Sequence, residues 1–468
     1  MTDVLRLALV EVGGAVPDAF ATALAASSGL AVVAIDEAPD CVLLIDGDAE
    51  VVEAGLPAFR AALAALEGSA AMYTDELALR SDSGVPILVQ KPGFDPERLR
   101  CQYYLGTIVA YTAQAWESLG GLREDLPWSV RGYDLALRAV RAGVAVEHYD
   151  IVPVGTAEGP RLGAIPAEAS DSVRSVLERH LAATGGGAVE AISLNGIHRT
   201  RRPVVGEPLV SIVIPTRGQS RPRGGVEHSY LVDAVRGIVE RSSYRNVEIV
   251  IVHDSVASPT VLQQVLQLAG ETAVLVEWTA PFNFSAKINW GVLHSRGEFV
   301  LLLNDDVDVI SPDWIERLLA LAQLPGSGMS GGMLYYQDDT VQHGGHHYWR
   351  GDAKHIAMYF PRGDPGPLGG LRVERQVAGV TAACALMPRS VYDQVGGMTQ
   401  LLPSAFNDVD LCMKVAAAGY RIFWTPYAEL YHFESKSRDP TVRKWEVDVA
   451  WGRWSRNMHQ PQFWPYPD

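Results

Sequence analysis

One pattern occurs twice in this chain, and it restricts the fold more than any other feature. An apolar run typical of a buried strand ends in a cluster of acidic residues, first over 41–51 (CVLLIDGDAEV) and again over 298–314 (EFVLLLNDDVDVISPDW). Each cluster is followed further along the chain by a Gly-Gly turn and then by a helical pattern, over 132–146 and over 407–424. We interpret the two series as an internal duplication.

Length and charge restrict the class of protein. The 468 residues exceed the usual size of one domain, so we expect more than one. The chain carries 39 Lys and Arg residues against 55 Asp and Glu residues, a formal net charge of −16. Nucleic acid is therefore disfavoured as a main partner, because proteins that bind polyanions are usually basic. Any phosphate group that this protein binds must be neutralised within its binding site, by a metal ion or by a few basic side chains.

Cysteine usage and hydropathy indicate the cellular compartment in which the protein is expected. The four cysteines are scattered without a Cys-x-x-Cys pair, which favours reduced thiols in a cytoplasmic protein. The first residues lack the basic segment of a signal peptide, and no apolar run reaches the roughly 18 residues of a spanning helix. We therefore expect a cytoplasmic protein without a transmembrane segment. Peripheral contact with the inner face of a membrane and homo-oligomerisation both stay open.

Apolar strands alternate with helices in the second series. PLVSIVIPTRG (208–218), VEIVIVHDS (247–255) and EFVLLLNDD (298–306) are patterned as buried strands, and each ends in polar residues. Helical patterns cover 231–241 and 260–269 between them. Parallel strands joined by helices place such polar ends at one edge of the sheet, where ligands bind. The sequence therefore predicts an α/β fold with a site at that edge.

The stretch between the two series differs in character from both. It begins with an amphipathic helical pattern over 167–184 and continues with a Gly- and Pro-punctuated stretch that predicts a short strand pair or a linker. We therefore expect four parts: residues 1–160, 161–207, 208–440 and a helical tail over 441–468.

An acidic cluster follows the last of these strands. Asn304, Asp305, Asp306 and Asp308 stand at its end and just past it. Crowded carboxylates repel one another unless a cation joins them. A hard divalent ion, Mg²⁺ or Mn²⁺, suits oxygen ligands of this kind, especially where substrate phosphates supply the remaining ones. The alternative is a solvated acidic turn before a helix that begins near Pro312, with Asp308 as a helix cap.

A second acidic pair, Asp408 and Asp410, begins a helical pattern. The N-terminus of a helix tolerates negative charge, so helix capping is the plain alternative for both residues. Side chains two residues apart on a helix do not share a face, so one carboxylate can face a cleft while the other anchors the helix. A carboxylate in a cleft can act as a general base toward a hydroxyl group.

Histidines supply the remaining candidates. His432 follows an apolar stretch and precedes Lys436 and Arg438. This pattern is consistent with an imidazole that binds a metal ion next to cations that bind a diphosphate. The segment 342–360 carries four more histidines, and Tyr348 and Trp349 stand among them. Zinc is an alternative there, although the spacing without cysteine supports it weakly. A loop that faces a sugar or an acceptor is the better interpretation, and a plain solvated loop stays open.

The ordered combination of these segments resembles family 2 glycosyltransferases, and the likeness is strongest over 208–440 with the rhamnosyltransferase-like branch. It rests on PLVSIVIPTRG, on 280–316 (APFNFSAKINWGVLHSRGEFVLLLNDDVDVISPDWIE), on 380–398 (VTAACALMPRSVYDQVGGM) and on 406–438 (FNDVDLCMKVAAAGYRIFWTPYAELYHFESKSR). The resemblance implies the GT-A fold, a Rossmann-like, mostly parallel sheet flanked by helices. It also implies inverting transfer from a nucleotide sugar.

Roles in catalysis and metal binding follow from this resemblance. Asp408 falls on the position of the catalytic base. Asn304-Asp305-Asp306 falls on the DxD-type motif, with Asn where the first Asp is usual, so Asp306 is expected as the main ligand of Mn²⁺ or Mg²⁺. His432 falls on a position that supplies a metal ligand in related enzymes, and Asn304 is expected to assist.

The resemblance also implies residues that bind the nucleotide sugar. In the family, an Asp near the nucleotide base stands where this chain has His253, so either Asp254 takes that role or the base contacts differ. Lys436, Arg438 or Arg375 would share in neutralising the diphosphate. The expected donor-binding residues are Pro215, Thr216, Arg217, Asp254, Lys287, Asn304, Asp305 and Arg438.

The first copy resembles the same family over about residues 40–155, but it lacks residues that the reaction needs. Asp46-Gly47-Asp48 retains the DxD form, whereas Gly132 stands at the base position and the expected downstream histidine is absent. Fewer residues also precede its acidic cluster. We therefore predict an incomplete, degenerate GT-A-like domain without transferase activity, which supports acceptor binding, dimerisation or the stability of the second domain.

Together these residues predict a metal-dependent, inverting glycosyltransferase. It would move a sugar from a UDP- or dTDP-sugar to a hydroxyl of a glycan or another acceptor. One alternative is a non-catalytic sugar-binding or scaffold protein built from degenerate GT-A domains. Another is a nucleotidyltransferase, which the Gly- and Arg-containing stretch over 216–225 supports only weakly. The sequence identifies neither the sugar nor the acceptor.

Overall fold

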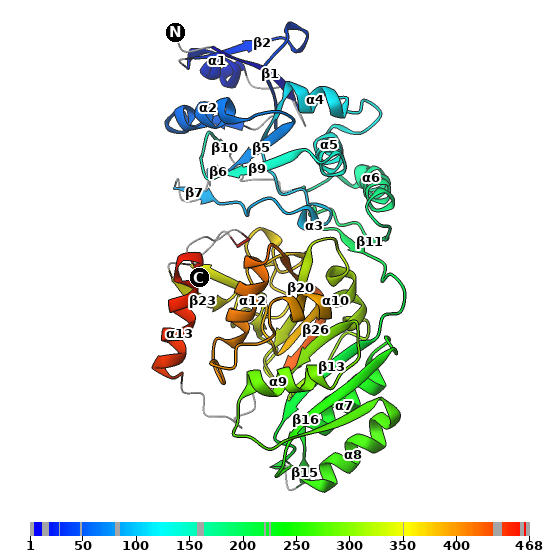
Figure 1. Cartoon of the computed structure of the whole chain (residues 1–468). Coiled ribbons are helices and arrows are strands. Elements are labelled where there is room, and N and C mark those ends of the chain that lie inside the picture. The colour runs from blue at the N-terminus through cyan, green and yellow to red at the C-terminus, as the bar shows by residue number, and fades with distance from the viewer. Residues whose placement is uncertain are drawn as a thin grey trace. The chain divides into compact units, whose positions relative to one another are not determined.

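The chain folds into two compact units in the computed structural model (Figure 1). One unit comprises Met1–Arg201 with Pro367–Gly369, and the other comprises Arg202–Gly366 with Gly370–Asp468. Among the helices that the structure describes, none is long and apolar enough to cross a membrane. The described residues are 4–11, 18–27, 29–46, 49–79, 85–156, 163–219, 221–223, 226–349, 351–433, 442–458 and 463–464.

A mixed sheet of ten strands forms the centre of the second unit. Its strands are β13 (Val210–Thr216), β16 (Val247–Asp254), β17 (Ala273–Trp278), β18 (Phe299–Leu303), β19 (Val307–Val309), β20 (Ser327–Tyr335), β21 (Val341–His343), β24 (Arg375–Gln376), β25 (Cys384–Pro388) and β26 (Arg421–His432). They lie in the order β17-β16-β13-β18-β25-β20-β26-β19, with β21 beside β20 and β24 beside β26. The strands from β17 to β18 are parallel, whereas β25 runs antiparallel to both of its neighbours.

Helices cover both faces of this sheet, because successive side chains of a strand point to opposite faces and both sets are apolar. Val213 of β13 belongs to one apolar core and Ile212 to the other. The helices of the unit are α7 (Tyr230–Arg241), α8 (Pro259–Ala269), α9 (Phe284–Leu293), α10 (Trp314–Ala322), α11 (Arg389–Gln394), α12 (Asn407–Ala417) and α13 (Lys444–Trp454). α9 and α12 contribute to the core of Val213, and α7, α8 and α10 to the core of Ile212. The α/β fold predicted from the alternation is therefore confirmed.

The first unit has a main sheet of six strands. These are β1 (Leu5–Glu11), β2 (Leu30–Val33), β3 (Cys41–Ile45), β5 (Ala70–Thr74), β8 (Ile108–Thr112) and β9 (Ala145–Tyr149), in the order β2-β1-β3-β8-β5-β9. A second sheet has the order β4-β10-β6-β7 and consists of β4 (Ala49–Val51), β6 (Glu76–Leu79), β7 (Pro86–Val89) and β10 (Val154–Thr156). The helices are α1 (Asp18–Ala26), α2 (Leu56–Ala65), α3 (Pro96–Leu99), α4 (Ala113–Leu119), α5 (Trp128–Ala142) and α6 (Ser170–Ala183).

The two main sheets share one topology. Along β2-β1-β3-β8-β5-β9 the neighbours are parallel, parallel, antiparallel, antiparallel and parallel. The series β16-β13-β18-β25-β20-β26 has the same sequence of directions. Within the described part of the first unit, no strand pairs with β2 on the side that β17 occupies in the second unit. This agrees with a duplication whose first copy is incomplete.

The stretch between the two series belongs to the first unit. Val173 and Leu177 of α6 lie in the same buried cluster as Leu135 of α5. After α6, β11 (Ala188–Ala191) and β12 (Arg199–Arg201) form an antiparallel pair, so of the two alternatives, a short strand pair or a linker, the structure has the pair. The first unit therefore extends to Arg201, because its core needs the apolar face of α6.

Candidate active site

The carboxyl ends of β13, β16 and β18 gather polar side chains, as the sequence predicts. Thr216 ends β13, and its hydroxyl donates to Oδ2 of Asp305, which follows β18, at 2.6 Å. Lys287 of α9 reaches the same edge, where its Nζ donates to Oδ1 of Asp254 at 2.8 Å and to the carbonyl oxygen of Thr216 at 2.5 Å. Four of the expected donor-binding residues therefore lie together at this edge.

Burial perturbs the charges of this group. Burial, and after it the charge of Asp306, raises the pKa of Asp305 to about 6, although Thr216 and Lys287 partly oppose the shift. Burial also lowers the pKa of Lys287, and its ion pair with Asp254 partly offsets this. Two adjacent carboxylates, of which Asp306 is buried, favour a bound cation, because each one disfavours ionisation of the other.

His432, the last residue of β26, faces the acidic cluster. Its Nδ1 lies 2.7 Å from Oε1 of Gln342, while the amide nitrogen of Gln342 donates to the His432 carbonyl at 3.4 Å. Because an amide oxygen can only accept, the proton of the neutral ring belongs on Nδ1 and the lone pair on Nε2. That Nε2 lies 2.9 Å from Nδ2 of Asn304 and 3.2 Å from Oδ1 of Asp306.

This donor set fits a divalent ion. The lone pair of one imidazole nitrogen and one carboxylate oxygen converge, and Asp306 is buried with 4% exposure. The Asn304 amide lies beside them with Nδ2 toward the ring, so it would ligate through Oδ1 after the amide turns. Mg²⁺ and Mn²⁺ accept such ligands. A hydrogen bond to the far nitrogen of a ligating histidine is the usual way in which its orientation is fixed, and Gln342 supplies it here.

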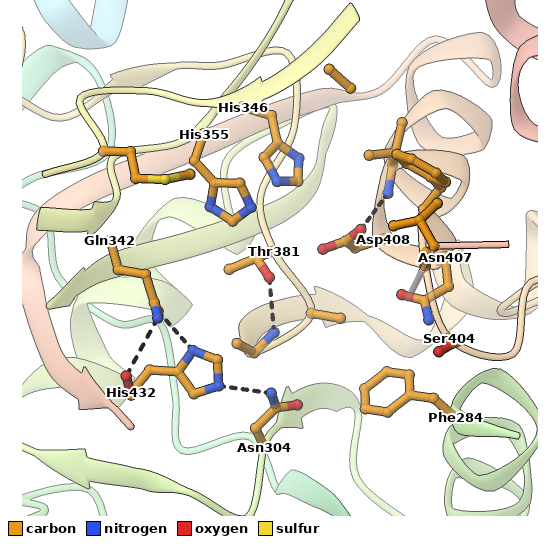
Figure 2. Close-up of a pocket in the computed structure, with 18 of the residues that line it drawn as sticks. Phe284, Asn304, Gln342, His346, His355, Thr381, Ser404, Asn407, Asp408 and His432 are labelled. Atoms are coloured by element: carbon orange, nitrogen blue, oxygen red, sulfur yellow. Dashed lines mark hydrogen bonds between the residues drawn. The ribbon is translucent and has the colours of Figure 1, made fainter. Parts of the chain in front are cut away.

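A cavity of about 320 Å³ brings this group and the candidate base together. Asn304 and His432 line it, and so does Asp408 from the first turn of α12. Figure 2 shows Asp408 on the α12 side of the cavity, with Asn304 and His432 across from it. Phe284, Thr381 and Ser404 also contribute to the lining.

The two carboxylates of α12 have separate environments. Asp408 faces the cavity, whereas Asp410 is fully buried and accepts hydrogen bonds from Trp454 Nε1 at 2.8 Å and Thr399 Oγ1 at 2.5 Å. Burial raises the pKa of Asp408, but His346, His355 and the hydrogen bonds from the Val409 N–H and from Thr381 together outweigh it, so this pKa lies below its ordinary value. Asp408 is therefore ionised near neutral pH, as a general base requires.

Strained backbone precedes this helix. Phe406, the residue before α12, has a φ of 58°, in the left-handed region that aromatic residues rarely adopt. Its ring packs edge-on against Trp451 of α13, with ring centroids 4.8 Å apart. Strain of this kind persists only where the surrounding structure holds it, and it often occurs beside functional groups.

Several sequence interpretations need correction. Asp308 forms an ion pair with Arg241 and does not cap a helix, since Asp313 precedes α10. Arg375 is buried, with its guanidinium over the rings of Trp424 and Trp464, so it supports the core instead of a diphosphate.

The exposure of several predicted site residues can also be compared with the structure. The loop over 342–360 is not a plain solvated loop, because His343, His346 and His347 are buried. Pro215 is also buried, inside β13, whereas Arg217 just beyond the strand is exposed. The positions of Gly47, Asp48, Lys436 and Arg438 lie outside the described residues.

Two residues of the site, Gln342 and Thr381, are not predicted from the sequence. Gln342 orients His432, and Thr381 lines the cavity between the two candidate groups. Gln342 stands at the start of the histidine-rich segment, so its position was the one available signal for it.

The fold and the cavity define an α/β protein with a carboxylate and a candidate metal site on the walls of one cavity. Residues 211–396 match the family model "Glycosyl transferase family 2". The chain therefore contains a family 2 glycosyltransferase domain with the GT-A fold, as the sequence predicts.

Curated relatives agree with this assignment. The uncharacterized protein y4gI of Sinorhizobium fredii is 35% identical over 78% of this chain and 41% of its own length. The O-antigen biosynthesis protein RfbC of Myxococcus xanthus is 28% identical over 85% of this chain and 31% of its own length. An N-acetylglucosaminyl-diphospho-decaprenol L-rhamnosyltransferase of Mycobacterium tuberculosis is 29% identical over 31% of this chain and 50% of its own length. The chain thus spans half or less of each of these relatives.

Two solved structures show a weaker likeness. The mannosyltransferase PcManGT of Pyrobaculum calidifontis, in complex with GDP-Man and Mn²⁺, matches 50% of this chain and 59% of its own with a TM-score of 0.37 and 17% identity. GalNAc-T7, with UDP, GalNAc and Mn²⁺, matches 57% of this chain and 52% of its own with a TM-score of 0.43 and 12% identity. At these scores the assignment rests on the family model and the topology alone.

Proposed function

We propose that the second unit transfers a sugar from a nucleoside diphosphate sugar to an acceptor hydroxyl, with inversion at the anomeric carbon. The observation that carries this proposal is the single cavity lined by Asp408 and, across from it, by Asn304 and His432. A base and a diphosphate site on opposite walls of one cavity are what a single displacement requires, because the acceptor oxygen and the leaving group lie on opposite sides of the anomeric carbon.

The donor would lie along the polar edge of the sheet. Thr216, Asp254 and Lys287 come from three different elements and are held together by hydrogen bonds. We assign them to the nucleoside end of a UDP- or dTDP-sugar, together with the exposed Arg217. Asp305, which is tied to Thr216, links this group to the diphosphate end.

Asp306, His432 and Asn304 would hold Mn²⁺ or Mg²⁺ at the diphosphate. When bound, the ion would neutralise negative charge on the departing nucleoside diphosphate. The chain supplies the orientation of this group, because Gln342 fixes the His432 ring. It also keeps Asp306 shielded from solvent.

Asp408 would act on the acceptor. Its carboxylate takes the proton from the acceptor hydroxyl while the acceptor oxygen forms a bond to the anomeric carbon and the bond from that carbon to the phosphate oxygen breaks. The proton stays on Asp408 until it exchanges with water. A raised pKa is not needed for this role, since the hydroxyl loses its proton late in the transition state.

The named relatives suggest the acceptor class. One is an O-antigen biosynthesis protein and another is a rhamnosyltransferase. We propose that this chain acts in polysaccharide biosynthesis and transfers a hexose or deoxyhexose to a glycan.

The first unit is proposed to be inactive as a transferase. Gly132 of α5 occupies the place that Asp408 has in α12. Two residues later, Asp134 pairs with Arg138 at 2.8 Å, just as Asp410 pairs with Lys414. The anchoring carboxylate is thus retained in this helix while the carboxylate for the reaction is absent.

A thermal-shift screen of UDP, dTDP, GDP and their sugars tests the proposal. A genuine donor stabilises the chain by mass action, and more strongly with Mn²⁺ than with a chelator present. The donor that is found is then incubated with Mn²⁺, and release of the nucleoside diphosphate is followed. Binding without any turnover, with or without glycan acceptors, would favour a sugar-binding protein. The exposed Asp352 supplies a matched control, Asp352→Asn, which should behave like the unmodified chain.

A further inference from the structure

Three histidines next to the cavity have no role in the reaction as proposed. His343 ends β21, and the hairpin of β22 (His346–Trp349) and β23 (Asp352–His355) supplies His346 and His355. Their ring centroids lie 5.0 Å apart for His343 and His346 and 4.8 Å apart for each of the other two pairs. His343 and His346 are buried, and His346 and His355 line the cavity.

The hydrogen bonds of His343 fix where its proton lies. The backbone N–H of Thr381 donates to Nε2 of His343 at 3.2 Å, so this nitrogen carries no proton. Burial lowers the pKa of His343 well below its ordinary value, which keeps the ring neutral. The single ring proton is therefore on Nδ1.

The position of the proton on His343 determines the position of the proton on His355. Nδ1 of His343 lies 2.9 Å from Nδ1 of His355, so the N–H of His343 donates and His355 accepts. The proton of His355 is then on its Nε2. A backbone amide, acting through one histidine, thus determines which nitrogen of a second histidine is a donor.

The same hydrogen bonds argue against a metal ion in this cluster. Nitrogen atoms of the three rings lie within 4.8 Å of one another, a spacing that by itself would admit a metal. A metal on Nδ1 of His343 would displace the proton, while Nε2 still faces the Thr381 N–H. The ring would have to become an imidazolate.

Asp408 is the charged group that these rings face. Figure 2 shows the His346 and His355 rings on the side of the cavity where the Asp408 carboxylate lies. Both histidines stabilise the ionised form of Asp408. Burial lowers the pKa of His346 to about 3, so this ring is neutral at pH 7.

We propose that His355 is a positioning residue for Asp408, and that the Thr381 backbone and His343 hold its Nε2–H as a fixed donor on the cavity side. The donor orients the Asp408 carboxylate toward the acceptor hydroxyl and keeps it ionised. This inference rests on the proposed function for its consequence in catalysis, but the hydrogen-bond chain itself does not depend on it.

Nitrogen-15 NMR of the full chain with labelled histidine tests the chain of hydrogen bonds without any substrate. We expect the Nδ1–H form for His343 and the Nε2–H form for His355 at neutral pH. The exposed His294, replaced in His294→Gln, gives a control for assigning signals. An Nε2–H form of His343 would overturn the proposal. A tightly bound zinc or copper ion that is lost in His343→Gln would overturn it as well.

The effect on Asp408 is measured through its carboxyl pKa, again without a donor. Asp408 is also faced by Tyr348 of β22, Cys412 of α12 and Thr381, and these stay unchanged in the comparison. His355→Leu should raise this pKa by about one unit, because a hydrogen-bond donor to the ionised form is lost. His355→Gln keeps a donor and should restore most of the shift. An unchanged pKa in His355→Leu would refute the proposal.

With the donor from the screen, the same variants are compared in turnover. The acid limb of the pH profile of kcat should move to higher pH in His355→Leu, with kcat reduced about tenfold and the donor KM unchanged. His355→Gln should recover most of the kcat and bring the acid limb back toward its original pH. If no donor is found but the carboxyl pKa moves, the proposed function fails and this inference stands. If Asp408→Asn is inactive while His355→Leu keeps both kcat and its acid limb, this inference fails and the proposed function stands.

Discussion

Nε2 of His432 lies 3.2 Å from Oδ1 of Asp306, although one residue ends β26 and the other follows β18. The strand β19, just beyond Asp306, pairs with the end of β26 and brings Val307 opposite His432. The position of the imidazole is thus set by the register of two strands that lie far apart in the sequence. The pairing of β19 with β26 brings the imidazole and the carboxylate of this candidate metal site together.

Removing His432 should therefore weaken metal-dependent donor binding without unfolding the unit. His432 is partly exposed, so His432→Ala should leave the thermal midpoint of the free protein nearly unchanged. The gain in midpoint from nucleoside diphosphate with Mn²⁺ should be largely lost. Equal stabilisation of both proteins, with Mn²⁺ and with chelator, would show that His432 is not a ligand.

The orientation of His432 should depend on Gln342. Gln342→Leu removes the acceptor at Nδ1, so the ring can rotate and change its tautomer. Loss of such a partner typically weakens metal affinity by about 10- to 100-fold. Isothermal titration with Mn²⁺ in the presence of nucleoside diphosphate measures this. Gln342→Glu keeps an acceptor and should retain most of the affinity, whereas a Leu variant with full affinity would contradict the role.

Asp408→Asn should lose turnover while it keeps donor binding. The amide has nearly the shape of the carboxylate but cannot take a proton, and general bases typically contribute about 10²- to 10⁴-fold. Single-turnover transfer is compared with the donor-induced thermal shift on the same preparations. Full turnover in this variant would reject Asp408 as the base.

Much of the fold could be read from the sequence, because apolar periodicity reports burial directly. The helix expected over 231–241 is α7, Tyr230–Arg241, and the strand over 247–255 is β16, Val247–Asp254. Strand direction has no such signal. β25 is as apolar as the parallel strands β13 and β18, yet it runs antiparallel to β18.

For the site, the sequence could indicate which residues carry chemistry but not what they touch. It proposed both Asp408 and Asp410, and only the packing shows that Asp410 is enclosed by Thr399 and Trp454 while Asp408 faces the cavity. Gln342 and Thr381 have side chains with no distinctive chemistry. Their roles come from strand register and backbone hydrogen bonds, which composition and spacing do not encode.

Asp410→Asn should lower stability strongly, in contrast to Asp408→Asn. The Asp410 side chain is fully buried and lies near Lys414 and Arg453. Breaking a buried ion pair by removing one partner typically costs about 3–5 kcal/mol. Urea unfolding of the two variants side by side should give a large loss only for Asp410→Asn. Similar midpoints for both would show that Asp410 does not anchor α12.

Acid should destabilise the first unit through His198. This residue is 1% exposed, stacks on Tyr133 with ring centroids 6.0 Å apart, and accepts at Nδ1 from the Ser193 N–H. Burial lowers its pKa from 6.5 to about 4. Because the folded pKa is the lower one, the unfolded chain binds the proton first. The stabilising contribution is therefore complete above pH 6.5 and is lost as the pH falls toward 4.

At a pH of about 5 the loss should approach about 2 kcal/mol from this residue alone. His198→Phe retains a ring on Tyr133 but cannot bind a proton, so its free energy of unfolding should fall less between neutral and acid pH than that of the unmodified chain. Urea midpoints at the two pH values measure the difference. His294→Gln is the matched control, because His294 is exposed and its replacement should leave the acid sensitivity as it is. An equal loss in His198→Phe and in the unmodified chain would mean that other groups cause the acid sensitivity.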